Sequence, residues 1–402
     1  MPALTRELLS VEEAQALVLE RARPLAAERV RVDEAAGRYL AVDARAVVDL
    51  PPFPSSAMDG FALRSADTPA TLPVLERIAA GRPPSRPLGA GEAMAIATGG
   101  VVPEGADAVI PIEYVVEHDN SVEIAETVAP GANVRPRGGD VRAGAVVVER
   151  GMRLGPGQVA ALAAAGVAEL DCGGRPRAAV LATGTELRLP GEALGPGEIY
   201  ESNGPLLAAS LTVAGAGVDR LPVAADDEEA HRAALERGLE ADVLVTSGGV
   251  SVGPHDLVRR IEAELGVEEV FWGVAVKPGK PVAFGVRGAT LVFGLPGNPV
   301  SSLVGFELFV RPAVLALQGA RSPLPAFLAG RLGASVRRNA HRDQLVRART
   351  RLDDEGAVML EPLEGQDSHM IVRAAGADAL VLVERGDGEV AAGAPARYLS
   401  LG

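Results

Sequence analysis

Three glycine-rich turns have residue types that suit the binding of a phosphate group. They lie at 183–186, 248–253 and 294–298, each at the end of an apolar run. Glycines let backbone N–H groups approach an anion closely, and the N-terminus of a following helix adds positive partial charge. None of the turns matches the GxGxxG or GxxxxGK[ST] pattern, which disfavours ordinary NAD or P-loop ATP binding.

A basic pair lies in the segment VKPGKP at 276–281, where Lys277 and Lys280 flank a Pro-Gly turn. Two ammonium groups held by prolines suit a phosphate or another oxyanion, although a solvated basic turn has the same composition. Lys and Arg number 39 against 53 Asp and Glu, a formal net charge of −14. A local basic pair in so acidic a chain favours the anion site.

Carboxylates lie near the same turns at Glu186, Asp226 and Asp256. Oxygen ligands at the ends of loops suit Mg²⁺, which takes few protein carboxylates and bridges phosphates. The alternative for the acidic run 226–229 is a helix N-terminus whose acids satisfy the dipole. His255 has no second His or Cys at ligand spacing, which leaves a zinc site weakly supported.

The turns require an α/β domain at 178–325 to position them. Apolar runs at 178–182, 242–247 and 290–295 alternate with stretches of helical spacing at 204–214, 226–239, 255–265 and 299–317. This alternation predicts a parallel sheet with helices on both faces. Asn203 and Asn298, each shortly before a proline, are good N-caps for two of the helices. Ligands bind beyond the carboxyl ends of such strands, so the three turns are expected on one edge.

The other segments differ in pattern from the α/β domain. Ser10 and Glu13 form a capping box for a helix over 10–23. A small inserted β domain is expected at 45–139, including a hairpin of 114–116 against 122–124. Residues 140–177, with a helix over 158–165, are expected to pack with 1–44. Residues 326–402 lack long helices, and their alternating stretches predict a small β-barrel or sandwich.

Composition excludes several classes of protein. The hydrophobic fraction of 48% is too high for wholesale disorder, and the acidic balance disfavours a nucleic-acid binder. The single cysteine, Cys172, indicates a reducing cytosol. No signal-peptide h-region is apparent, and the most apolar long stretch, 299–318, is interrupted by Glu307 and Arg311. A cytoplasmic protein without a membrane span is therefore expected.

Seven motifs together resemble one known family, the molybdopterin molybdenumtransferases of the MoeA type, to which the C-terminal domain of gephyrin is related. They are PPFPSSAMDGFAL (51–63), TGGVVPEGADAVIPIE (98–113), TGTEL (183–187), ESNGPLLAA (201–209), TSGGVSVGPHDLV (246–258), KPGKPVAFG (277–285) and GLPGNPVSS (294–302). The resemblance runs from about residue 5 to the C-terminus in the expected order.

The resemblance implies cytosolic homodimers of four-domain subunits with an active site shared between the subunits. Such enzymes insert molybdate into adenylylated molybdopterin in a Mg²⁺-dependent reaction that releases AMP and molybdenum cofactor. The implied partners, besides the second subunit, are a molybdopterin adenylyltransferase and molybdoenzyme apoproteins. The implied domains are 1–44 with 140–177, the insert 45–139, the molybdopterin-binding domain 178–325 and the barrel 326–402.

The resemblance also assigns residues. The implied catalytic residues are Asp59, Glu186, Asp226, Asp256, Lys277 and Lys280, with Glu186 and Asp59 also implied at the metal. The residues implied in cofactor binding are Thr98, Asp140, Thr183, Gly184, Gly248, Gly249, Ser251, Pro296, Gly297, Asn298 and Pro299. Asp59 of one subunit is expected to reach the cleft of the other.

Two other functions remain open at this level. One is a non-catalytic molybdopterin-binding or scaffold role of the gephyrin type. The other is a single-domain adenylyltransferase, which the extra residues 1–177 and 326–402 argue against. The segment 366–370, Gln-Asp-Ser-His-Met, departs from the family's QGSGM-like form, which leaves open what the C-terminal domain binds.

Overall fold

A computed structural model of the chain describes residues 8–223, 227–249 and 257–401. The described chain forms two compact units. The first, here the sheet unit, comprises 8–28, 37–41 and 172–401, and the second, the insert unit, comprises 29–36 and 42–171. The expected division into four domains stays a prediction.

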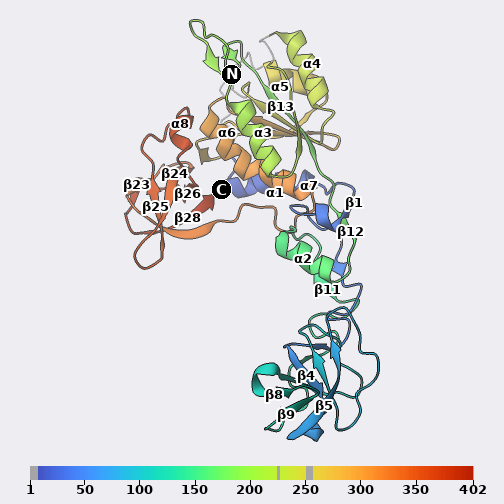
Figure 1. Ribbon diagram of the computed structural model, residues 1–402. Coiled ribbons are helices and arrows are strands. Elements are labelled where there is room, and N and C mark those ends of the chain that lie inside the picture. Colours follow the sequence, from blue (N-terminus) through green and yellow to red (C-terminus); the bar gives the residue numbers. More distant parts are fainter. Residues whose placement is uncertain (1–7, 224–226, 250–256, 402) are drawn as a thin grey trace. The chain divides into compact units, whose positions relative to one another are not determined.

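The sheet unit is built on a six-stranded sheet with the order β16-β13-β17-β21-β20-β18 (Figure 1). Its strands are β13 (Arg177–Ala182), β16 (Gly217–Arg220), β17 (Val243–Ser247), β18 (Glu268–Trp272), β20 (Ala283–Arg287) and β21 (Thr290–Leu295). β16, β13, β17 and β21 run parallel, and the three predicted strands are confirmed to within one residue. Their near-continuous apolar runs are typical of strands that are covered on both faces.

The sheet departs from the predicted parallel arrangement at one edge, where β20 and β18 run antiparallel. Arg287 pairs with Thr290, and the short turn between them contains Gly288 with φ +60°. So short a turn can join only antiparallel neighbours, because a parallel connection needs a crossover of a dozen or more residues.

Helices cover both faces of the sheet, as predicted (Figure 1). They are α3 (Asn203–Val213), α4 (Glu228–Gly238), α5 (Leu257–Glu264) and the continuous helical stretch of α6 (Pro299–Gly305), the π-helical turn η4 (Phe306–Val310) and α7 (Arg311–Leu317). Alternate strand residues face opposite sides, so Val180 packs in the core with α3 and α6, and Leu181 packs with α4 and α5. α1 (Val11–Arg21) begins at the predicted Ser10–Glu13 capping box and buries Val18 in the first of these cores.

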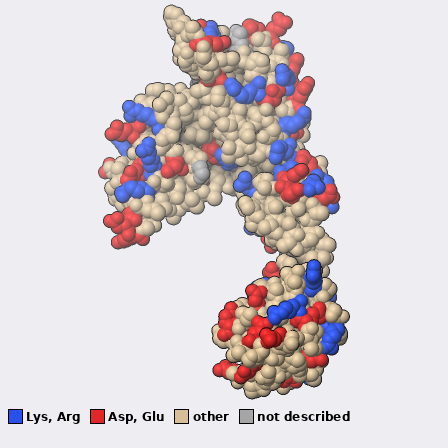
Figure 2. Space-filling view, viewed as in Figure 1, with Lys and Arg blue, Asp and Glu red and all other residues tan. Residues whose placement is uncertain are grey.

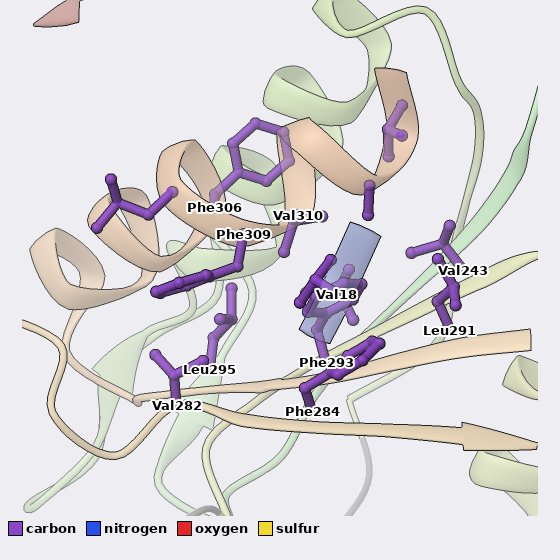
Figure 3. Packing of buried hydrophobic residues seen from close by; sticks show 14 of the residues in the cluster. Val18, Val243, Val282, Phe284, Leu291, Phe293, Leu295, Phe306, Phe309 and Val310 are labelled. Atoms are coloured by element: carbon purple, nitrogen blue, oxygen red, sulfur yellow. The ribbon is translucent and has the colours of Figure 1, made fainter. Parts of the chain in front are cut away.

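The stretch Pro299–Leu317 has the length and apolar composition of a membrane span, but 83% of its most apolar window is buried inside the protein. Figure 3 shows Phe306, Phe309 and Val310 lying over strand residues that include Phe284 and Phe293. This packing is that of a core helix.

The C-terminal residues form a closed barrel in which β24 pairs with both β25 and β26. Its strands are β22 (Leu328–Leu332), β24 (Asp343–Leu352), β25 (Val358–Pro362), β26 (Ala379–Val383) and β28 (Pro395–Ser400). The short strand β19 (Val276–Lys277) pairs with the start of β24 and so joins the lysine turn to the barrel. α8 (Ile371–Ala374) lies between β25 and β26.

The insert unit contains a six-stranded sheet of its own, of order β7-β4-β6-β5-β9-β8, and the helix α2 (Pro156–Ala164). Its strands are β4 (Gly60–Leu63), β5 (Ala70–Ile78), β6 (Ala93–Ile96), β7 (Ala108–Pro111), β8 (Val116–His118) and β9 (Ser121–Ile124). The predicted hairpin is present, but its first strand begins at Val116, because 112–114 form a 3₁₀ turn. On the face shown in Figure 2, basic and acidic side chains are interspersed.

We expect Phe293→Ala to destabilise the sheet unit by about 3–5 kcal/mol, because it removes a fully buried ring from the core. Phe293 is 0% exposed, and its ring centroid lies 4.9 Å from that of Phe284. Urea unfolding followed by the fluorescence of Trp272, the single tryptophan, reports on this unit. The control Val372→Ala, at a side chain 86% exposed, should change stability by less than about 0.5 kcal/mol. Equal effects of the two variants would contradict the packing.

Candidate active site

A cavity of about 650 Å³ opens at the carboxyl ends of β13, β17 and β21. Described residues of all three glycine-rich turns line it, namely Thr183, Gly184, Glu186, Gly248, Gly249, Gly297 and Asn298, and Pro299 follows the third turn on the same wall. The structure thus brings together the turns that the sequence places at one edge. The N-termini of α3 and α6 border the same cavity, which favours negative charge there.

Backbone hydrogen bonds hold the turns against one another. Thr183 N donates to Ser247 O at 3.1 Å, and Gly248 N donates to Leu295 O at 3.1 Å. Gly248 has φ +92°, and a Cβ there would lie 2.9 Å from Thr183 O. Only glycine adopts this positive φ readily and also has no Cβ to contact Thr183 O. The close approach of the turns at 183–186 and 248–253 therefore depends on Gly248.

Asn203 clamps two of the strand ends from a third element. Its Nδ2 donates to Ser247 Oγ and to Gly297 O, each at 2.7 Å. The sequence predicts Asn203 as an N-cap, which is wrong: it is the first residue of α3, whose N-cap is Ser202. The Asn203 side chain donates to the ends of two other segments, at Ser247 and Gly297, rather than capping its own helix. Asn298 does precede α6 as expected, with Pro299 at the first helical position.

The carboxylate of Glu186 is exposed at the cavity wall and lies back over Gly184. A Cβ at Gly184, where φ is +147°, would lie 2.5 Å from Glu186 Oε2. The exposed carboxylate could move aside, so it is the φ of Gly184, a value that L side chains rarely adopt, that favours glycine in this turn. Among the described residues no group of three His, Cys, Asp or Glu side chains converges.

The two lysines do not line the cavity. Lys277 and Lys280 are exposed on their turn, and Gly279 between them approaches α6: a Cβ there would lie 3.5 Å from Ser301 O. The lysine turn thus lies beside the helix whose N-terminus borders the cavity. Pro296 is buried outside the cavity wall, and its carbonyl accepts a hydrogen bond from Ser302 Oγ at 2.5 Å.

The C-terminal barrel also contributes to the cavity wall, through His369 and Ile371. Val300 N, in the first turn of α6, donates to Ser368 O at 3.1 Å and so joins this helix to the segment of the barrel that contains His369. The sequence of 366–370 departs from the family pattern, which marked this segment as unusual but did not predict that it contacts the cavity or α6.

Arg347 holds the segment that carries His369. The guanidinium is 1% exposed and donates to the carbonyl oxygens of Met370, Gly365 and Asp367, at 2.8, 2.7 and 3.1 Å. Burial lowers the pKa of Arg347, and the nearby Asp367 opposes this shift. Because arginine stays protonated even so, the segment is held by a buried cation that donates to its backbone.

A second cavity, of about 720 Å³, shares Ala182, Leu187 and Glu201 with the first. Glu201 is 2% exposed, accepts a hydrogen bond from Gly204 N at 2.6 Å and pairs with Arg220 at 3.3 Å. The two cavities therefore adjoin at a buried, partnered carboxylate.

In the insert unit, the structure brings Thr98 to Asp59. Thr98 N and Oγ1 donate to Asp59 Oδ1 at 2.7 and 3.0 Å. The backbone N–H and then the hydroxyl of Thr98 lower the pKa of Asp59, so that it is ionised at neutral pH.

The Asp140 carboxylate is exposed, and no hydrogen bond joins it to Asp59. Asp226, Ser251, His255 and Asp256 lie outside the described residues.

We expect Arg347→Met to destabilise the barrel by at least about 3 kcal/mol, because it leaves buried carbonyl groups without donors. Amide hydrogen exchange at 365–371 should rise. Arg351→Met on the same strand is the matched control, since Arg351 pairs with Glu361 on the surface and its side chain is 63% exposed. The account of this segment fails if exchange at 365–371 is unchanged in Arg347→Met.

We expect Thr98→Val to raise the pKa of Asp59 but to leave it below the ordinary value, because the backbone N–H remains. Since the folded-state pKa is lowered, this carboxylate adds stability above its unfolded-state pKa, and that contribution is lost as pH falls through the folded-state pKa. An NMR titration of the Asp59 carboxyl carbon in both proteins measures the shift. An unchanged titration would show that the hydroxyl contributes nothing.

Comparison with known proteins finds matches along most of the chain. Residues 9–166 match the MoeA N-terminal region (domain I and II), 179–316 a "probable molybdopterin binding domain" and 329–401 the MoeA C-terminal region (domain IV). A molybdopterin molybdenumtransferase of Haemophilus influenzae is 34% identical over 392 residues, 96% of this chain and 97% of that protein. Molybdopterin molybdenumtransferase 2 of Mycobacterium tuberculosis is 40% identical over 342 residues, 81% of this chain and 84% of that protein.

A solved structure agrees with these matches. The crystal structure of the molybdopterin biosynthesis MoeA protein from Pyrococcus horikoshii has a TM-score of 0.82 and 32% identity, covering 98% of this chain and 99% of that one. The chain therefore belongs to the MoeA family of molybdopterin molybdenumtransferases.

Proposed function

We propose that this protein is a cytoplasmic enzyme of molybdenum cofactor biosynthesis that inserts molybdate into adenylylated molybdopterin and releases AMP. One observation carries the proposal: in a chain of the MoeA family, three glycine-rich turns and two helix N-termini border one cavity. That arrangement suits a phosphate-bearing ligand. The adjoining cavity adds about 720 Å³, room for a ligand with two large halves.

The proposed roles combine the position of the glycine-rich turns with the roles that the family resemblance implies. Backbone groups of the turns hold the phosphates, with Lys280 supplying positive charge from the neighbouring turn, while Lys277 attracts molybdate. Asp226 or Asp256 accepts hydrogen bonds from the amino group and ring N–H of the pterin, as a carboxylate does well with paired donors. Catalysis on these terms is mostly positioning and stabilisation of phosphate charge.

A magnesium ion fits the residues present. Mg²⁺ takes one or two protein carboxylates and completes its shell with waters and substrate phosphates. Glu186 offers one exposed carboxylate at the cavity, and Asp59 of the partner subunit would supply another. When bound, the ion would neutralise phosphate charge. A closed zinc site fits less well, because the described residues bring no third ligand to this place.

We further propose that the protein works as a homodimer with active sites shared between subunits. Glu186 lies in the sheet unit and Asp59 in the insert unit. Expected further partners are the adenylyltransferase that supplies the substrate and the apoproteins that receive the product.

The test of the activity is an incubation of the purified protein with adenylylated molybdopterin, Mg²⁺ and molybdate, with AMP and active cofactor as readouts. We expect AMP release that depends on molybdate. Binding of the ligand without any molybdate-dependent AMP release would favour the scaffold function instead.

Mixed dimers test the sharing of the site. We expect Asp59→Ala and Glu186→Ala each to abolish most activity as homodimers, because each removes a carboxylate from every site. Heterodimers of the two variants should recover activity, since one of their two sites then has both carboxylates. Verified heterodimers without recovery would overturn the shared site and leave the proposed reaction standing.

A further inference from the structure

His231 lies in the first turn of α4 and lines the cavity at the carboxyl edge of the sheet, although it is only 1% exposed. Its Nδ1 lies 2.9 Å from the carbonyl oxygen of Asp227. The same carbonyl accepts the backbone N–H of His231 at 3.1 Å. The imidazole is therefore fixed by its own helix.

This hydrogen bond determines which ring nitrogen carries the proton. A carbonyl oxygen only accepts, so Nδ1 must be the protonated nitrogen. In the neutral ring, Nε2 then carries a lone pair and is an acceptor. Within the described part of the chain, no group donates to Nε2 of His231. Because His231 lines the cavity, Nε2 is free to accept a hydrogen bond from a group that enters it.

Asn203 gives an independent observation on the same wall. Its Nδ2 is used on Gly297 O and Ser247 Oγ, while its Oδ1 is buried and has no hydrogen-bond partner. His231 and Asn203 thus each donate hydrogen bonds to other protein groups, and each keeps one acceptor atom, Nε2 and Oδ1, without a protein donor. Phosphate oxygens cannot satisfy such acceptors, because they too accept hydrogen bonds.

We propose that Nε2 of His231 accepts a hydrogen bond from an N–H or O–H group of the ligand and so determines specificity for its uncharged part. The inference rests on the proposed function: the turns hold the phosphates, and His231 recognises a donor on the pterin or on the adenosine. Either half carries such donors, as an amino group or ring N–H on the pterin and as an amino or hydroxyl group on the adenosine.

Two variants separate recognition from packing. His231→Leu fills a similar volume and removes the acceptor, whereas His231→Gln can place its amide oxygen near the position of Nε2. We expect His231→Leu to raise KM for adenylylated molybdopterin about 5- to 10-fold with kcat little changed, the loss of one hydrogen bond that is formed equally in ground and transition states. His231→Gln should restore most of the affinity, and thermal unfolding of each variant checks its folding.

Binding of simple probes identifies the half of the ligand that is read. The affinities of AMP and of a pterin without the dithiolene side chain are measured for the wild type and for His231→Leu, beside inosine monophosphate and the 2-deamino pterin. We expect the loss with one of the two parent probes. If an amino group donates to Nε2, the loss of affinity caused by His231→Leu should disappear with the analogue that lacks that amino group. If the ribose hydroxyl donates instead, the loss should persist with both AMP and inosine monophosphate.

Three outcomes would overturn this inference. They are an unchanged KM in a folded His231→Leu protein, no rescue by His231→Gln, and equal losses for all four probes. These results differ from a failure of the proposed function, which would appear in the wild type as an absence of molybdate-dependent AMP release.

Discussion

The common register of β13, β17 and β21 is the constraint on which the candidate site depends. Ala182 pairs with Ser247, and Ser247 pairs with Leu295, so the three strands end at the same level. The turns that follow them must then meet at one edge. The amide of Asn203 adds a side-chain clamp between Ser247 and Gly297, and Gly248 allows the contact with Thr183.

The barrel completes this edge rather than standing apart from it. Arg347 holds the backbone of 365–370, Ser368 joins that segment to α6, and His369 then reaches the cavity wall. In addition, β24 pairs with β19, which contains Lys277 and leads into the turn of Lys280. Backbone hydrogen bonds therefore connect the barrel both to the cavity wall and to the strand that contains Lys277.

Much of the sheet unit is predictable from the sequence, because its signals are local. Buried parallel strands appear as continuous apolar runs, and the ligand turns follow them directly, which places Glu186 and Gly297 without any knowledge of packing. The antiparallel edge at β20 was missed because its apolar run looks the same in either direction. The contact of Thr98 with Asp59 joins residues 39 positions apart, which no local pattern indicates.

His231, His369 and Arg347 show the limit of sequence reasoning at the site. His231 lies in a helix whose charges and spacing look ordinary. The role proposed for it depends on the hydrogen bond of Nδ1 to the Asp227 carbonyl and on its place in the cavity wall. Arg347 has the sequence context of an exposed strand residue, yet it is 1% exposed because a loop folds over it. Such roles arise from tertiary contacts, which residue type and spacing do not encode.

The central claim is that the shared carboxyl edge of β13, β17 and β21 binds the phosphorylated ligand. Amide hydrogen exchange of the full chain, with and without adenylylated molybdopterin and Mg²⁺, tests it most directly. The account predicts slower exchange in 183–187, 247–249 and 297–300 on binding. Saturated ligand binding with unchanged exchange in all three segments would contradict it.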